Sequence, residues 1–153
     1  MKVLIPVEDK QFASLITEFV CNHVWPGDVE FRLLNVFESV LLQEVVSPLA
    51  MQQLEEATEL SQSLGRSLMM DVGTQLRLKF PPCKIEELLK EGDPKYVILD
   101  MIKNWKPDFV IMGSHGKGSL ERFFLGSVSL AVLSHAPCSV VIIKIPSEHK
   151  KLL

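Results

Sequence analysis

The sequence predicts an α/β protein built on a parallel sheet that helices cover on both faces. Short runs of consecutive apolar residues, at 2–7 and 140–143, are typical of strands buried on both sides. Stretches with apolar residues at three- and four-residue spacing lie between such runs along the whole chain. Strands that alternate with helices in this way form right-handed βαβ units in one parallel sheet.

Length and composition agree with one ordinary domain over residues 1–153. Hydrophobic residues make up 47% of the chain and charged residues 23%, the balance of a globular protein rather than a disordered one. No repeat, linker or low-complexity tract interrupts the pattern, and 153 residues are enough to bury a core.

The first half of the chain predicts two strands and two helices. Residues 2–7 form a strand, 12–24 form a helix that ends at Pro26, and 29–37 form a second strand. Residues 48–80 then predict the longest helix. We expect Gly65 and Gly73 to be weak points in this helix, which Pro81 and Pro82 end.

The second half repeats the alternation. Residues 83–89 predict a strand, and Gly92, Asp93 and Pro94 then supply a turn, an N-cap and the first helical residue. The helix that follows ends at residues 106–108.

The last elements follow at once. Residues 109–112 predict a fourth strand, 127–134 a helix and 139–145 a final strand, with a frayed tail behind it.

Residues 112–129, MGSHGKGSLERFFLGSVS, join the fourth strand to the last helix. A Walker A loop requires Ser or Thr after its lysine, but Lys117 is followed by Gly118. A dinucleotide fingerprint would need glycine where Glu121 stands and belongs after the first strand. A nucleophile elbow needs G-x-S-x-G, but Ser114 directly follows Gly113. These three motifs are therefore excluded, and no catalytic residue is predicted.

The spacing Gly113-x2-Gly116-x9-Gly126-Ser127 instead predicts two groups of backbone donors. Gly113 and Gly116 would let the chain leave the strand in conformations that bulkier residues avoid, which brings amides close to a ligand. Gly126 and Ser127 open a helix whose unpaired amides favour phosphate oxygens. Together they suit a polyphosphate at the carboxyl end of a strand, although the glycines also suit a tight turn and Ser127 a simple N-cap.

This pattern resembles the nucleotide-binding signature G-x2-G-x9-G-[ST] of the universal stress protein family. The stretches KVLIPV at 2–7, GDP at 92–94, VIMGSHG at 110–116 and HAPCSVV at 135–141 are similar to the same family. The resemblance covers nearly the full length and implies a flavodoxin-like, Rossmann-like three-layer sandwich with strand order 3-2-1-4-5. Members with an intact signature bind ATP, so it implies a regulatory or sensing ligand of that kind.

The resemblance also implies which residues surround the nucleotide. They are Pro6, Val7, Glu8 and the backbone of Val36 on the adenosine side, Met112, Gly113, His115 and Gly116 at the ribose and phosphates, and Gly126, Ser127, Val128 and Ser129 along the phosphate chain. A divalent cation, Mg²⁺ or Mn²⁺, would be held chiefly through the phosphates, with no metal site made by the protein.

One position departs from the family pattern. The ATP-binding members usually carry Asp after the first strand, where this chain has Glu8, Asp9 and Lys10. The longer side chain of Glu8 displaces its carboxylate, so either Asp9 compensates or affinity falls. The nucleotide is therefore ATP or another adenine nucleotide. The alternatives are an interaction module of the same fold without nucleotide, or a weak ATPase that would depend on His115; fast catalysis is not expected.

Charge and cysteine content restrict the partners. The net charge is −3 and Lys and Arg are scattered, so we expect no nucleic-acid partner. No stretch approaches the ~20 apolar residues of a membrane span, which predicts a cytosolic protein without membrane contact. Cys21, Cys83 and Cys138 lie far apart and suit buried free thiols rather than disulfides or a zinc site.

The final strand is apolar on both faces and lies at an edge of the predicted sheet, so something must cover it. Family members that this chain resembles pair this strand across a two-fold axis. The resemblance therefore implies a homodimer through Val140, Val141, Ile142 and Ile143. Coverage by the tail at 146–153 is the alternative.

Overall fold

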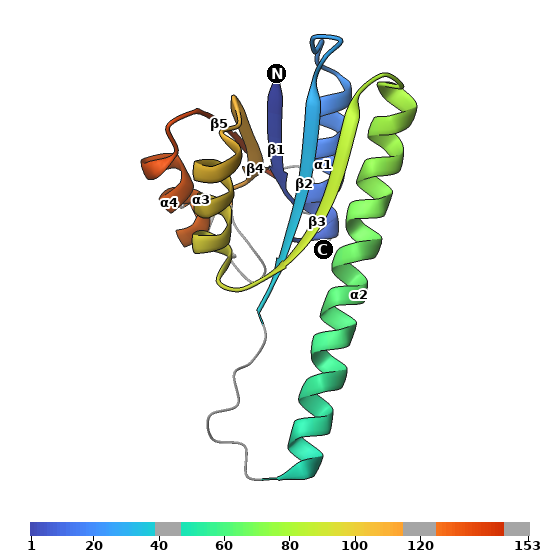
Figure 1. Cartoon of the computed structure of the whole chain (residues 1–153), viewed down its shortest axis with the longest axis vertical. Helices are drawn as coiled ribbons and strands as arrows, with labels where there is room; N and C mark the ends of the chain where they lie inside the picture. Colours follow the sequence, from blue (N-terminus) through green and yellow to red (C-terminus); the bar gives the residue numbers. More distant parts are fainter. Residues whose placement is uncertain (39–46, 115–124, 146–153) are drawn as a thin grey trace.

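The structure is a computed structural model that describes residues 1–38, 47–114 and 125–145. Five parallel strands form one sheet in the order β3-β2-β1-β4-β5. The strands are β1 Lys2–Pro6, β2 Glu30–Phe37, β3 Lys84–Glu91, β4 Phe109–Gly113 and β5 Ser139–Ile143. Helices α1 Lys10–Cys21 and α2 Pro48–Lys79 cover one face, and α3 Pro94–Trp105 and α4 Ser127–His135 cover the other (Figure 1). The predicted fold class and strand order are confirmed.

Consecutive apolar residues are needed in the central strand because each face of the sheet has its own core. Val3, Leu4 and Ile5 of β1 have no exposed surface. Val3 and Ile5 pack in the core under α1 and α2, whereas Leu4 packs in the core under α3 and α4. Neighbouring strand residues face opposite layers, so a buried strand between two layers must be apolar at every position.

The turn before α3 forms as the sequence predicts. Gly92 adopts a φ of +137°, a conformation that other residues rarely take. Asp93 caps the helix, since its Oδ1 accepts hydrogen bonds from Lys95 N at 2.8 Å and Tyr96 N at 3.4 Å. The left-handed Lys106 then ends α3.

α2 runs without interruption through Gly65 and Gly73, so the prediction of weak points there is wrong. A Cβ placed on Gly65 would lie 2.8 Å from Cγ of Asn35, and one on Gly73 would lie 3.2 Å from Cδ of Glu87. Gly65 lets the helix approach the buried Asn35 of the sheet closely, whereas Gly73 leaves room for the carboxylate end of Glu87. These tertiary contacts outweigh the helix propensity cost of glycine, about 1 kcal/mol.

The predicted element ends shift by one to a few residues. β1 ends at Pro6 rather than residue 7, β3 extends to Glu91, and β5 ends at Ile143 rather than residue 145. Among the described strands, β5 pairs with β4 alone and is an edge. The tail at 146–153 lies outside the described residues, and the homodimer stays a prediction.

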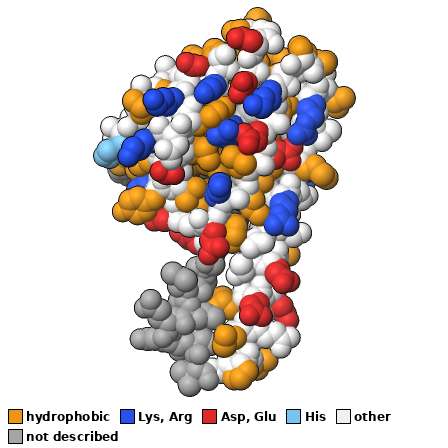
Figure 2. Space-filling model, viewed as in Figure 1, with side chains coloured by type: hydrophobic (Ala, Val, Ile, Leu, Met, Phe, Trp, Pro, Cys, Tyr) orange, Lys and Arg blue, Asp and Glu red, His pale blue; other side chains and the backbone are white. Residues whose placement is uncertain are grey.

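Positively and negatively charged side chains are interspersed on the face seen in Figure 2, over the sheet and α3.

The three thiols are free and half-buried, and burial raises the pKa of Cys21, Cys83 and Cys138. In the described part of the chain, no helix combines the length and hydropathy needed to cross a membrane.

Candidate functional site

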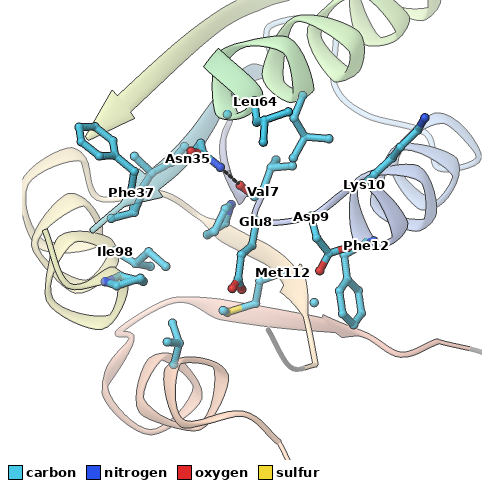
Figure 3. A pocket seen from close by; sticks show the side chains of 18 of the residues that line it. Val7, Glu8, Asp9, Lys10, Phe12, Asn35, Phe37, Leu64, Ile98 and Met112 are labelled. Carbon is cyan, nitrogen blue, oxygen red and sulfur yellow. Dashed lines mark hydrogen bonds between the residues drawn. The ribbon is translucent and has the colours of Figure 1, made fainter. Parts of the chain in front are cut away.

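A cavity of about 1020 Å³ opens at the carboxyl ends of β1, β2 and β4 (Figure 3). β1 and β4 are neighbours in the sheet, but the chain continues from β1 into α1 on one face and from β4 into α4 on the other. The segments after these strands therefore diverge and leave a crevice, which is where open parallel sheets bind ligands.

Ten of the twelve residues proposed for nucleotide binding line this cavity. They are Pro6, Val7, Glu8, Val36, Met112, Gly113, Gly126, Ser127, Val128 and Ser129. The other two, His115 and Gly116, lie outside the described residues. Residues separated by more than a hundred positions in the sequence thus share one crevice.

The end of β4 and the start of α4 are hydrogen-bonded to each other. The Gly126 amide donates to the Ser114 carbonyl at 2.8 Å, and the Ser129 hydroxyl donates to the Gly113 carbonyl at 2.9 Å. Ser114 and Ser129 are both buried. The end of β4 and the start of α4 therefore lie side by side, and the hydroxyl proton of Ser129 is directed at β4 rather than at the cavity.

Gly113 is required for a reason other than the one predicted. Among the described glycines, only Gly92 has a positive φ, so Gly113 does not use a conformation closed to other residues. A Cβ at Gly113 would instead lie 2.6 Å from Cγ of Phe12 in α1. Glycine is needed here because the Phe12 ring packs directly on the strand end.

The start of α4 places the backbone amides of its first turn beside the cavity. Gly126 is the N-cap, with φ −60° and ψ 158°, so Ser127 is the first helical residue and the N-cap reading of Ser127 is wrong. The first bond within the helix runs from Leu130 N to Gly126 O. The amides of residues 127–129 precede that bond, and such first-turn amides carry the positive end of the helix dipole.

The structure shows how the acidic pair after β1 is used. Asp9 is the N-cap of α1, and its Oδ1 accepts a hydrogen bond from Phe12 N at 2.9 Å. Its carboxylate is thereby fixed at the helix start. The side chain of Glu8 instead extends toward Met112 at the end of β4 (Figure 3). The Glu8 side chain thus faces the crevice, whereas the Asp9 side chain caps α1.

Sequence reasoning missed Asn35, a buried polar residue that lines the cavity. It is 6% exposed, and its Nδ2 donates to the Val7 carbonyl at 2.7 Å (Figure 3). The signal was present in the sequence, because Asn35 is the one amide inside the apolar run that ends β2. Buried amides in such runs are hydrogen-bonded and specific in their placement.

Two walls of the cavity were also missed. Ser61, Leu64, Gly65 and Leu68 of α2 line one side, and Pro94 and Ile98 of α3 line another. These residues carry no local motif, since they reach the cavity only through the packing of helices on the sheet.

The described lining is more acidic than basic. It contains the carboxylates of Glu8, Asp9, Glu38 and Asp71 and the ammonium of Lys10. No group of three or more His, Cys, Asp or Glu side chains in the described ranges is arranged to hold a metal ion. In the described lining, the first-turn amides of α4 and the ammonium of Lys10 are the groups that favour an anion.

Known proteins share both sequence and fold with this chain. The profile of the universal stress protein family matches residues 1–144. A universal stress protein A-like protein of Arabidopsis thaliana is 44% identical over 59 residues, 39% of this chain and 34% of that protein. The universal stress protein Sll1388 of Synechocystis sp. is 36% identical over 93 residues, 61% of this chain and 59% of that protein. The match thus spans less than two thirds of either relative.

Solved structures show the same fold. The hypothetical protein MJ0577 superposes with a TM-score of 0.80 at 23% identity, over 95% of this chain and 96% of that chain. A universal stress protein family protein from Arabidopsis thaliana with AMP bound gives a TM-score of 0.68 at 23% identity, over 97% and 94% of the two chains. A universal stress protein in complex with cAMP gives 0.61 at 13% identity, over 95% and 98%. Given the profile match over most of its length, this chain belongs to the universal stress protein family.

Proposed function

We propose that this protein binds an adenine nucleotide, with ATP as the first candidate, in the cavity at the ends of β1, β2 and β4. One observation carries the proposal: ten residues chosen for that role from the sequence lie along one cavity at the switch point of the sheet. The nucleotide would act as a regulatory or sensing ligand.

The proposed orientation follows from the chemistry of the lining. The phosphates lie at the start of α4, where the amides of Ser127 and Val128 offer donors at the positive end of the helix. The adenosine lies among apolar side chains, including Val7, Ile98 and Met112. Apolar walls with a few placed polar groups are typical of small-molecule sites.

A divalent cation accompanies ATP in this proposal. Four carboxylates line the cavity against one lysine in its described part, and a chain of three phosphates would be repelled by them. Mg²⁺ or Mn²⁺ held by the phosphates reduces that repulsion. Relatives with AMP and with cAMP bound support an adenine ligand with fewer charges as the second candidate.

A substitution at Ser127 separates phosphate binding from folding. Ser127→Asp places a carboxylate in the first turn of α4, which favours the helix dipole but repels phosphate. We expect the affinity for ATP to fall by at least about 100-fold, because like charges about 4 Å apart repel by about 4 kcal/mol near a protein surface. Isothermal titration calorimetry on nucleotide-stripped protein measures this.

Two controls accompany that measurement. Ser127→Asn introduces a side chain of the same size as the aspartate but without its charge. This variant should bind ATP within a few-fold of the native chain. Adenosine, which has no phosphate, should bind Ser127→Asp and the native chain equally well. If neither ATP nor AMP binds the native chain, and denatured protein releases no nucleotide, the nucleotide proposal is wrong and the interaction module is favoured.

A further inference from the structure

The hydrogen-bond ladder between β1 and β2 has a regular order up to the cavity. Glu30 N donates to Met1 O at 2.8 Å, and Val7 N donates to Leu34 O at 2.9 Å. In a parallel ladder, alternate residues of a strand bond the same neighbour. The even-numbered residues of β2 therefore turn their backbone toward β1. The next bond of the ladder would run from the Val36 amide to the Val7 carbonyl.

The Asn35 side chain replaces that bond. Among the hydrogen bonds between described residues, the Val7 carbonyl accepts from Asn35 Nδ2 at 2.7 Å and not from the Val36 amide. β1 has ended at Pro6 and the chain turns away into α1, so no further β1 residue reaches Val36. The backbone N–H and C=O of Val36 thus both face the cavity that Val36 lines.

Asn35 is held in this orientation from both sides. The Val7 carbonyl can only accept, so the nitrogen of the carboxamide must point to it. The rest of the carboxamide packs against Gly65 of α2, where a Cβ would lie 2.8 Å from Cγ of Asn35. With 6% of its surface exposed, Asn35 has little room to turn.

We infer that Asn35 is a positioning residue that ends the β1–β2 ladder one bond early and leaves the Val36 backbone to read a nucleobase edge. The inference rests on the proposed function. Adenine offers an acceptor at N1 beside its N6 amino donor, which complements the Val36 N–H and C=O. Guanine offers a donor at N1 beside its O6 acceptor, the reverse order. The arrangement therefore selects adenine over guanine.

The variant Asn35→Leu tests the ladder itself. It replaces the carboxamide with an apolar side chain of similar size and removes the donor, so the Val36 amide is free to bond the Val7 carbonyl. In the nucleotide-free protein, we expect hydrogen exchange of the Val36 amide, followed by NMR, to slow by at least about tenfold, as for a newly bonded amide. Asn104→Leu, an exposed position on α3, is the matched control and should leave this rate unchanged.

Nucleotide binding supplies the second readout. For Asn35→Leu we expect AMP affinity to fall by at least about tenfold and the preference for AMP over GMP to shrink, because a site built to pair polar groups loses discrimination without them. Should Asn35→Leu not fold, Asn35→Asp keeps the shape while its carboxylate can only accept, and the same direction is expected.

The outcomes separate the two proposals. Equal exchange rates of the Val36 amide in the native chain and the Asn35 variant would overturn the inference, whatever the nucleotide result. If the Val36 amide exchanges more slowly in the variant but the native chain binds no adenine nucleotide, the proposed function and the nucleobase role of Asn35 are refuted. A slowed amide with AMP affinity and base preference unchanged would also overturn the positioning role.

Discussion

At the scale of single residues, Asn35 and Gly65 act as one packing unit. Asn35 joins the ends of β1 and β2 through the Val7 carbonyl, and α2 can lie over it only because position 65 has no side chain. The same close approach explains why a glycine is placed in the middle of a long helix, where local propensity disfavours it.

We therefore predict that Gly65→Ala destabilises the fold by about 1 to 3 kcal/mol, because the added Cβ displaces the buried Asn35 carboxamide. In an Asn35→Ala background the methyl group has room, so the two substitutions should show an interaction energy of roughly 1 kcal/mol or more in urea denaturation. Gly27→Ala, which has nothing within 4 Å of the new Cβ, is the control and should change stability by less than about 0.5 kcal/mol. Additive effects of the two substitutions would contradict the packing unit.

At the scale of elements, α4 is fastened to β4 at the site itself. The buried Ser129 hydroxyl bonds the Gly113 carbonyl, whereas Ser134, one and a half turns further along α4, bonds Leu130 O at the surface. The first bond joins two elements, and the second stays within one helix. Their loss should therefore affect the molecule differently.

Ser129→Ala should lower the free energy of unfolding by about 1 to 3 kcal/mol, because it leaves the Gly113 carbonyl without its partner. Ser134→Ala should lower it by less than about 0.5 kcal/mol, since water replaces an exposed hydroxyl bond. Chemical denaturation of both variants decides this. Equal losses would mean that the Ser129 bond does not fasten α4 to the strand.

The sequence predicts most of the helices and strands. Pro94, Asp93 and Gly92 mark the start of α3 by local chemistry alone, and the apolar runs of β1 and β4 mark a sheet covered twice. The local sequence does not predict where α2 lies. Gly65 alone indicates a weak point in a helix, and its role becomes clear only from the contact with Asn35. Gly113 was recognised as part of the site, but its partner Phe12 is a hundred residues away.

At the scale of the whole molecule, the two outer strands of the sheet, β3 and β5, differ in chemistry. β3 carries charged residues such as Lys84, Glu86 and Lys90 along an edge, a pattern that discourages strand pairing. β5 is apolar throughout after Ser139. We propose that β5 is the edge through which two copies of this chain pair.

The hydrogen-bond pattern shows how to test that pairing. Ser139 N donates to Asp108 O, and Ile143 O accepts from Ser114 N. The backbone N–H and C=O groups of the odd-numbered residues of β5 therefore face β4, and those of Val140 point away from β4. Val140→Pro removes an outward donor while sparing the β4 ladder, and the variant should be monomeric and folded by light scattering and circular dichroism. Val141→Pro removes an inward donor and should destabilise the fold instead. A native chain that is monomeric at micromolar concentration would refute the pairing.

The central claim is that an adenine nucleotide occupies the crevice where β1, β2, β4 and α4 meet. Titration of ¹⁵N-labelled, nucleotide-stripped protein with AMP, observed by NMR, tests it most directly. We predict saturable shifts of the Val36, Gly113 and Val128 amides, with much weaker shifts for GMP. Shifts confined to the smaller cavity lined by Lys90, Tyr96 and Asn104, or no saturable shift at the three amides, would contradict the account.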